Sequence, residues 1–148
     1  MRDIDEISGD VLNVSVRRHR DLGPGLLESV YEAILAAKLE RMGYDVARQR
    51  PIDIEYDGIR FAAAFRIDLL VGLVGDRLLV EIKSVEHLTP AHGKQLLTYL
   101  RLTHQPVGLL INFGGATLKE GVRRIVNDHR PSASPRLRVN QPSSSNGD

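Results

Sequence analysis

Three polar residues, Asp68, Glu81 and Lys83, interrupt two otherwise apolar segments at positions that would bring their side chains together. A short loop at Leu73–Asp76 would join the segments as a hairpin of antiparallel strands. In the register that this loop dictates, Asp68 lies opposite Glu81. Glu81 and Lys83 are two residues apart, so they point to the same face of their strand. We therefore predict that two carboxylates and one ammonium group share one face of a sheet.

Two carboxylates about 5 Å apart across a strand pair are destabilising unless a positive charge lies between them. Mg²⁺ suits such a pair, because it takes one or two carboxylates and keeps several waters. Lys83 could then contact a scissile phosphate or hold the attacking water, and the chemistry would be metal-assisted hydrolysis of a phosphodiester. A surface hairpin with Glu81–Lys83 and Asp68–Arg66 ion pairs is the alternative, and the hairpin alone favours neither interpretation.

Two expected helices carry further polar side chains that could join such a site. Glu28 begins an apolar stripe, which suggests that it points inward, although a first-turn glutamate favoured by the helix dipole is slightly more common. Gln95 and Tyr99 lie one turn apart and could reach a phosphate or a base. They could equally form the polar edge of an amphipathic helix, which is the more frequent case. The stripe that Glu28 begins continues through Tyr31, Leu35, Leu39 and Met42.

The elements that must position these residues follow from hydrophobic periodicity. Apolar residues occupy the odd positions of segment 59–71, which predicts a strand with one buried face, and Asp57-Gly58 before it indicates a tight hairpin. Thr89 and Pro90 have the pattern of a helix N-cap followed by proline. Together the segments predict an α/β or α+β domain with a mixed sheet of about four strands flanked by helices. We expect helices at 4–20, 26–42, 90–103 and 118–128, and strands at 52–56, 59–71, 77–83 and 107–113.

Length and composition predict a soluble, cytoplasmic protein with one domain. The chain has 148 residues and no cysteine, its first ten residues lack the pattern of a signal peptide, and no apolar run approaches the roughly 20 residues needed to span a membrane. We expect a single domain over 1–130 and a disordered tail over 131–148, which is rich in Pro and Ser. The formal net charge is only +1. Any nucleic-acid contact therefore needs a local patch such as Arg17, Arg18 and Arg20, although such clusters are more often a solvated helix face.

The motifs together resemble the GxxExxY proteins, a family of the PD-(D/E)XK nuclease superfamily. The resemblance extends from about Ile7 to Asn127 and implies a restriction-endonuclease-like core of helix, three-stranded meander, helix and strand. The matching segments, in chain order, are Gly25-Leu-Leu-Glu28-Ser-Val-Tyr31, Arg66-Ile-Asp68-Leu-Leu-Val71, Val80-Glu81-Ile-Lys83, Gln95-Leu-Leu-Thr-Tyr99-Leu and Gly108-Leu-Leu-Ile-Asn112-Phe113.

The resemblance also implies roles for individual residues. Asp68 and Glu81 would hold Mg²⁺ or Mn²⁺ together with the Ile82 backbone carbonyl, and Lys83 would be the catalytic lysine. The acidic group from the preceding helix would be Glu28. Gln95 and Tyr99 are similar to the Q-x-x-x-Y element of RecB-like nucleases, whose side chains support the active site and its nucleic acid.

We therefore expect a metal-dependent nuclease that acts on DNA rather than RNA. The sequence departs from the family pattern at Gly72, at Gly93 and in the alanine run Ala62–Ala64. An active site with weakened or altered catalysis is therefore an alternative. A module that has the nuclease fold but binds nucleic acid or a protein without catalysis is the alternative, because residues 1–130 carry as many acidic as basic side chains. A domain this small offers little surface for long DNA, and a homodimer is one arrangement that would enlarge that surface.

Overall fold

The computed structural model describes residues 2–72 and 75–128, which form three α-helices, a 3₁₀ turn and one five-stranded sheet. The disordered tail expected at 131–148 lies outside these residues, as does the end of the expected domain. No helix in the described ranges is long and apolar enough to cross a membrane. In chain order the elements are α1 (Ile4–Leu22), α2 (Glu28–Arg41), β1 (Asp45–Tyr56), β2 (Ile59–Gly72), β3 (Leu78–Lys83), α3 (Pro90–Thr103), β4 (Val107–Asn112), η1 (Lys119–Gly121) and β5 (Val122–Val126).

The three α-helices form where the sequence places them, and their ends have local causes. Asp3 caps α1 in a capping box with Glu6. Gly23, with φ of 72°, ends α1 by donating its N–H to the His19 carbonyl at 2.8 Å. Thr89 is the N-cap of α3 and Pro90 its first residue, as predicted.

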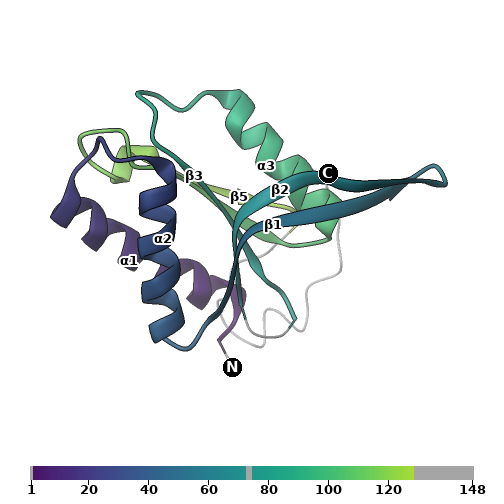
Figure 1. Cartoon of the computed structure of the whole chain (residues 1–148), viewed down its shortest axis with the longest axis horizontal. Coiled ribbons are helices and arrows are strands. Elements are labelled where there is room, and N and C mark those ends of the chain that lie inside the picture. The colour runs from purple at the N-terminus through teal and green to yellow at the C-terminus, as the bar shows by residue number, and fades with distance from the viewer. Residues whose placement is uncertain (1, 73–74, 129–148) are drawn as a thin grey trace.

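The helices cover the two faces of the sheet (Figure 1). The strand order is β1-β2-β3-β4-β5, with antiparallel neighbours throughout except for the parallel pair β3–β4. A parallel pair needs a crossover, and α3 supplies it. On one face, α1 and α2 bury side chains such as Val11, Leu35 and Val80. On the other face, α3 buries Leu96 and Leu100 against Leu79, Leu110 and Ile67.

The prediction of a helix at 118–128 is wrong. The chain makes the 3₁₀ turn η1 and then β5, which pairs with β4 from Ile111–Val122 to Val107–Val126. Two physical causes favour the strand: Val122, Ile125 and Val126 are β-branched and suit an extended backbone, and the outer side of β4 carries backbone groups that need partners. The sheet therefore has five strands rather than about four, within the same mixed α+β architecture.

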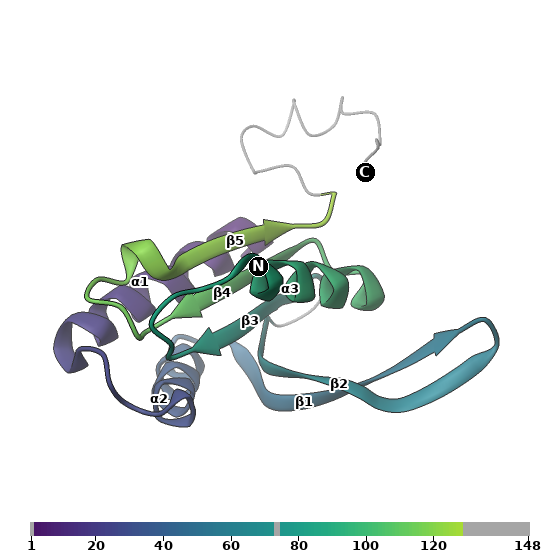
Figure 2. The ribbon, with the colours of Figure 1, turned by 90° about the horizontal axis from the view of Figure 1, so that it is seen from above.

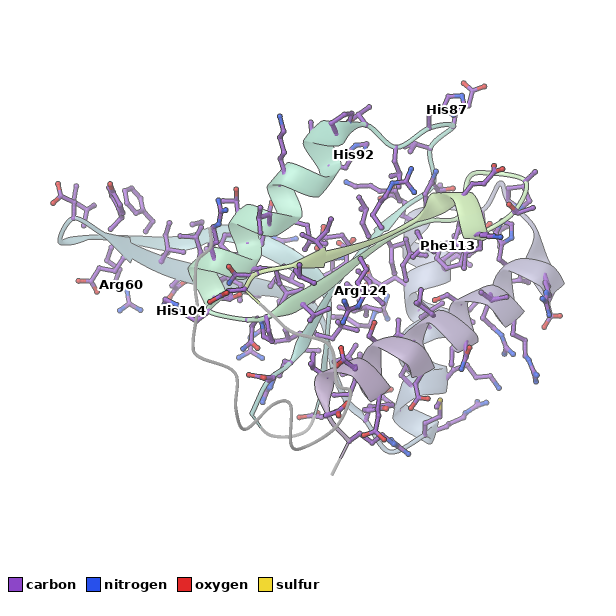
Figure 3. The ribbon with its side chains drawn as sticks, turned by 180° about the vertical axis from the view of Figure 1, so that it is seen from behind. Arg60, His87, His92, His104, Phe113 and Arg124 are labelled. Carbon is purple, nitrogen blue, oxygen red and sulfur yellow. The ribbon has the colours of Figure 1, made fainter. Side chains whose placement is uncertain are left out.

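The hairpin of β1 and β2 is longer than the sequence indicated and extends away from the helices as an arm (Figures 1 and 2). Asp57 and Gly58, both with positive φ, form its tight turn as predicted. One buried face along the whole of 59–71 was expected, but Ile59 is 56% exposed and Phe61 45% exposed. The buried pattern begins only near Phe65, because no helix reaches the outer half of the arm, where Arg60 lies (Figure 3).

Two features interrupt the regular pairing of β1. Pro51 lies on this strand, which is an edge of the sheet, where a missing N–H is tolerated. The register shifts between Ile52 and Ile54, opposite a bulge in β2. At the bulge Ala63 has φ of 50° and donates its N–H to Asp53 Oδ1 at 2.8 Å.

The loop after β4 passes so close to the segment after β3 that only glycine fits at position 114. A Cβ at Gly114 would lie 2.1 Å from the Val85 carbonyl oxygen and 2.7 Å from the Val85 nitrogen. We predict that Gly114→Ala lowers the free energy of unfolding by about 2 kcal/mol or more, since overpacking against backbone typically costs about 1–3 kcal/mol. Gly115→Ala is the matched control, because its nearest neighbour would be the Thr117 oxygen at 3.5 Å. Chemical denaturation of both variants checks this, and equal midpoints would contradict the packing argument.

Candidate metal centre

The candidate site lies where β2 separates from β3. The ladder between the two strands ends with the pair Leu69 and Val80. This is the register that the sequence predicts, although residues 73 and 74 of the expected loop lie outside the described part of the chain. One step further along the strands, Asp68 and Glu81 stand opposite each other. Here the carboxylate oxygens, rather than backbone carbonyls, accept hydrogen bonds from the N–H groups of the opposite strand.

Each of the two carboxylates accepts a hydrogen bond from the opposite strand's backbone. The Asp68 N–H donates to Glu81 Oε2 at 3.1 Å, and the Ile82 N–H donates to Asp68 Oδ2 at 2.8 Å. Because the N–H and C=O of a strand residue project to the same side, the Ile82 carbonyl also faces this gap between the strands. The gap therefore holds two carboxylates and one backbone carbonyl, the three groups that were expected from the sequence as metal ligands.

Glu28 lies beside the end of β3, but it is not buried as its place on the apolar stripe suggested. Its Oε2 accepts the Ser84 N–H at 3.1 Å, and Ser84 Oγ donates to the Leu26 carbonyl at 2.9 Å. Figure 2 shows the arrowhead of β3 beside α2. The side chain stays exposed because α2 begins at Glu28, so no earlier helical turn covers it.

Contacts of Tyr31 hold the segment before Glu28 in one conformation. Its ring is fully buried and stacks on Phe113 with the ring centroids 4.3 Å apart. Its hydroxyl donates to the Gly23 carbonyl at 2.6 Å and accepts the Leu26 N–H at 3.2 Å. The turn between α1 and α2 is therefore tied to the core, which fixes the start of α2 next to the carboxylates.

A second acidic residue on α2 was not predicted from the sequence. Glu32 is only 3% exposed, and it accepts hydrogen bonds from Arg48 Nε at 2.9 Å and Gln49 Nε2 at 2.6 Å. Gln49 Nε2 also donates to Asp68 Oδ1 at 3.1 Å, so it connects the two carboxylates. Glu32 lies one helical turn after Glu28 and so shares its face of α2. That spacing is the feature of the sequence from which Glu32 could have been identified. Gln49 could not be found, because the first half of β1 was not predicted.

Two of the remaining expected residues lie near the carboxylates. Lys83 is half-buried on the same strand face as Glu81. Burial raises the pKa of both Asp68 and Glu81, and the positive charge of Lys83 partly offsets that rise. Tyr99 is partly buried and stacks on Phe65 with the ring centroids 4.1 Å apart.

Gln95 is less closely connected to the carboxylates. It is exposed one turn before Tyr99, and within the described residues its side chain makes no hydrogen bond. By contrast, burial raises the pKa of Tyr99, and the nearby charges of Glu81 and Asp68 add to that rise. The structure therefore brings Tyr99 toward the carboxylates and leaves Gln95 at the surface.

Burial and mutual repulsion make the two carboxylates hard to ionise together. Burial raises the pKa of Glu81 to about 8, and the neighbouring charge of Asp68 adds to the shift. Burial also raises the pKa of Asp68, against the opposing hydrogen bonds from Ile82 and Gln49. A positive charge between the carboxylates would favour their ionised forms, which is what a divalent cation supplies.

The donor set fits a hard cation such as Mg²⁺ or Mn²⁺. In residues 2–72 and 75–128, no group of three or more His, Cys, Asp or Glu side chains has an arrangement that could hold a metal. Mg²⁺ does not require one, since it is usually bound by one or two carboxylates and keeps several waters. Asp68, Glu81 and the Ile82 carbonyl meet that requirement with oxygen ligands alone.

Comparisons with known proteins identify the superfamily of this chain. A family model described as "PD-(D/E)XK nuclease superfamily" matches residues 5–125, which include every residue of the candidate site. A solved structure titled "Crystal structure of SSO0001" aligns with 82% of this chain and 78% of its own, at 16% identity and a TM-score of 0.43, which is too distant to support an argument. A search of curated proteins gives no significant match.

The raised pKa of Glu81 predicts how stability depends on pH when no metal is present. The folded protein holds a proton on Glu81 up to a pH of about 8, whereas the unfolded chain releases it near 4.5. The free energy of unfolding should therefore fall as the pH rises from about 4.5 to 8, by a few kcal/mol at about 1.4 kcal/mol per pKa unit. Urea denaturation at several pH values in EDTA measures this.

Glu81→Gln should remove most of that decrease and be more stable than the wild type at pH 8. The exposed Glu55→Gln is the control and should keep the wild-type slope. If Glu81→Gln and the wild type lose stability in parallel as the pH rises, Glu81 is not the titrating group.

Proposed function

This chain belongs to the PD-(D/E)XK nuclease superfamily, and we propose that it is a metal-dependent nuclease that hydrolyses phosphodiester bonds of DNA. The observation that carries the proposal is the pair of carboxylates, Asp68 and Glu81, seated across the gap between β2 and β3 with Lys83 on the same strand face as Glu81. Two carboxylates that repel each other are stabilised by a bound cation, so this pair favours a function that depends on a metal ion.

Each residue has a role that its position supports. Asp68, Glu81 and the Ile82 carbonyl would hold Mg²⁺ or Mn²⁺, which supplies electrophilic stabilisation of the reacting phosphate when bound. Lys83 would bring an ammonium group to the phosphoryl oxygens, where negative charge develops. Glu28, which begins α2 beside the end of β3, would orient the attacking water.

α3 supports the substrate side of the proposed site. Tyr99 lies on the carboxylate side of this helix, and Gln95 is exposed one turn closer to its N-terminus. A phosphate or base that approaches the carboxylates from solvent would meet these two side chains. We assign to them the positioning of the nucleic acid, with DNA as the expected substrate.

A binding module without catalysis is the second candidate, and one observation favours it. Both carboxylates already accept backbone hydrogen bonds, and Gln49 occupies a further acceptor position on Asp68. If these contacts are too stable to be replaced by a cation, the fold would bind nucleic acid without cleaving it. Titration with Mn²⁺ followed by calorimetry separates the two candidates, because only the nuclease requires binding that Asp68→Asn removes.

Cleavage should depend on the metal and on Lys83. We predict that the purified protein cleaves DNA with Mg²⁺ or Mn²⁺ and not in EDTA, and that Lys83→Ala lowers the rate about 100-fold or more, in the range seen when a charge-stabilising group is removed. Lys119→Ala removes an exposed lysine from η1 and is the matched control. Gel assays with labelled DNA and RNA measure the rates, and circular dichroism confirms that the variants fold.

Activity that persists in EDTA or in the Lys83→Ala variant would contradict the proposed mechanism. Faster cleavage of RNA than of DNA would keep the mechanism and change the substrate.

A further inference from the structure

A groove with a strongly positive lining lies between α1 and α2. Its volume is about 320 Å³ and it is open to solvent. Four of its lining side chains carry a positive charge, and none carries a negative one. The lining residues are Asn13, Val14, Arg17, Arg18, Lys38, Arg41 and Met42.

The spacing on both helices directs these side chains into one place. On α1, Arg17 lies one turn after Asn13, and Arg18 one turn after Val14. On α2, Lys38 and Arg41 are three residues apart and share a face. The sequence alone indicated only an arginine cluster on one helix, and the structure joins two of those arginines to two cations from a second helix.

Within residues 2–72 and 75–128, no ion pair neutralises the positive charges of the groove. The ion pairs there involve Arg2, Arg48, Arg60 and Arg124, and none of the four groove cations. Arg18 Nε is buried and has no hydrogen-bond partner in the same ranges. A solvated helix face would leave this N–H in water, so its burial without a partner separates the groove from an ordinary charged surface.

Like charges gathered in a concave place repel each other and focus a positive potential. Such an arrangement lowers the stability of the free protein, and an anion that enters the groove relieves the repulsion. The fork of an arginine suits the oxygens of a phosphate, and Asn13 adds a neutral donor.

We propose that this groove binds the phosphate backbone of the nucleic acid, as a second contact away from the carboxylates. This role rests on the proposed function, because a nuclease substrate is a polyanion with regularly spaced phosphates. α2 links the two places: Glu28 begins the helix beside β3, and Lys38 follows ten residues later, roughly 15 Å along the axis at about 1.5 Å per residue. That length corresponds to about four or five steps of a duplex strand at about 3.4 Å each.

The test compares two pairs of substitutions in the full chain. Lys38→Ala with Arg41→Ala removes two groove cations, and Arg101→Ala with Lys119→Ala removes two exposed cations elsewhere. Fluorescence anisotropy with a labelled DNA duplex, in EDTA and over a series of salt concentrations, measures affinity. We expect the groove pair to weaken binding about tenfold or more and to lower the salt slope by about two, since each neutralised phosphate contributes roughly one unit.

Equal decreases in affinity in the groove and control pairs would overturn the proposal, because they would show a general effect of net charge. An unchanged affinity and salt slope in the groove pair would overturn it as well. Displacement of the DNA by polyglutamate as effectively as by unlabelled duplex would overturn it too, and would assign the groove to an acidic protein surface instead.

The same measurements keep this proposal separate from the proposed nuclease activity. A wild-type protein that binds DNA through the groove but cleaves none supports the groove and contradicts the nuclease. A wild-type protein that cleaves DNA with Mg²⁺, while the groove pair binds as tightly as the wild type, supports the nuclease and contradicts the groove.

Discussion

The electrostatic conflict between Asp68 and Glu81 is the constraint on which the rest of the site depends. At the point where the β2–β3 ladder ends, Glu81 is buried and Asp68 is partly buried, and the charge of Asp68 opposes the ionisation of Glu81. Backbone N–H groups from both strands hold the pair in place. The fold therefore keeps two acids together in a place where they are stable only when protonated or accompanied by positive charge.

The surrounding structure holds the end of β3 from several sides. Asn112 accepts the Val85 N–H and donates to the Val85 carbonyl, both at 2.9 Å, while the Phe113 N–H donates to the Lys83 carbonyl at 2.8 Å. From the other side, Ser84 is bonded to the start of α2. The backbone around Lys83 is thus fixed to β4 and α2, and within the described residues its ammonium group makes no ion pair.

The sequence predicted the parts that depend on local patterns and on strand register. Alternation and turn residues located β2, and the register that places Asp68 opposite Glu81 is confirmed by the ladder that ends at Leu69 and Val80. Glu32 was not predicted as a site residue, because its buried position depends on hydrogen bonds from Arg48 and Gln49. Those two residues belong to a strand whose sequence shows no clear alternation of apolar and polar residues. β5 was not predicted, because the choice between helix and strand there depends on a tertiary effect. The backbone groups on the outer side of β4 need hydrogen-bond partners, and β5 supplies them.

The irregularities of β1 bear on how copies of the chain meet one another. An outer strand with a regular row of free N–H and C=O groups is a template for aggregation. Pro51 carries no backbone N–H, and the shift between Ile52 and Ile54, opposite the bulge at Ala63, interrupts the regular pairing of β1. Addition of a further molecule at the β1 edge is therefore disfavoured, even though the arm leaves apolar side chains in solvent.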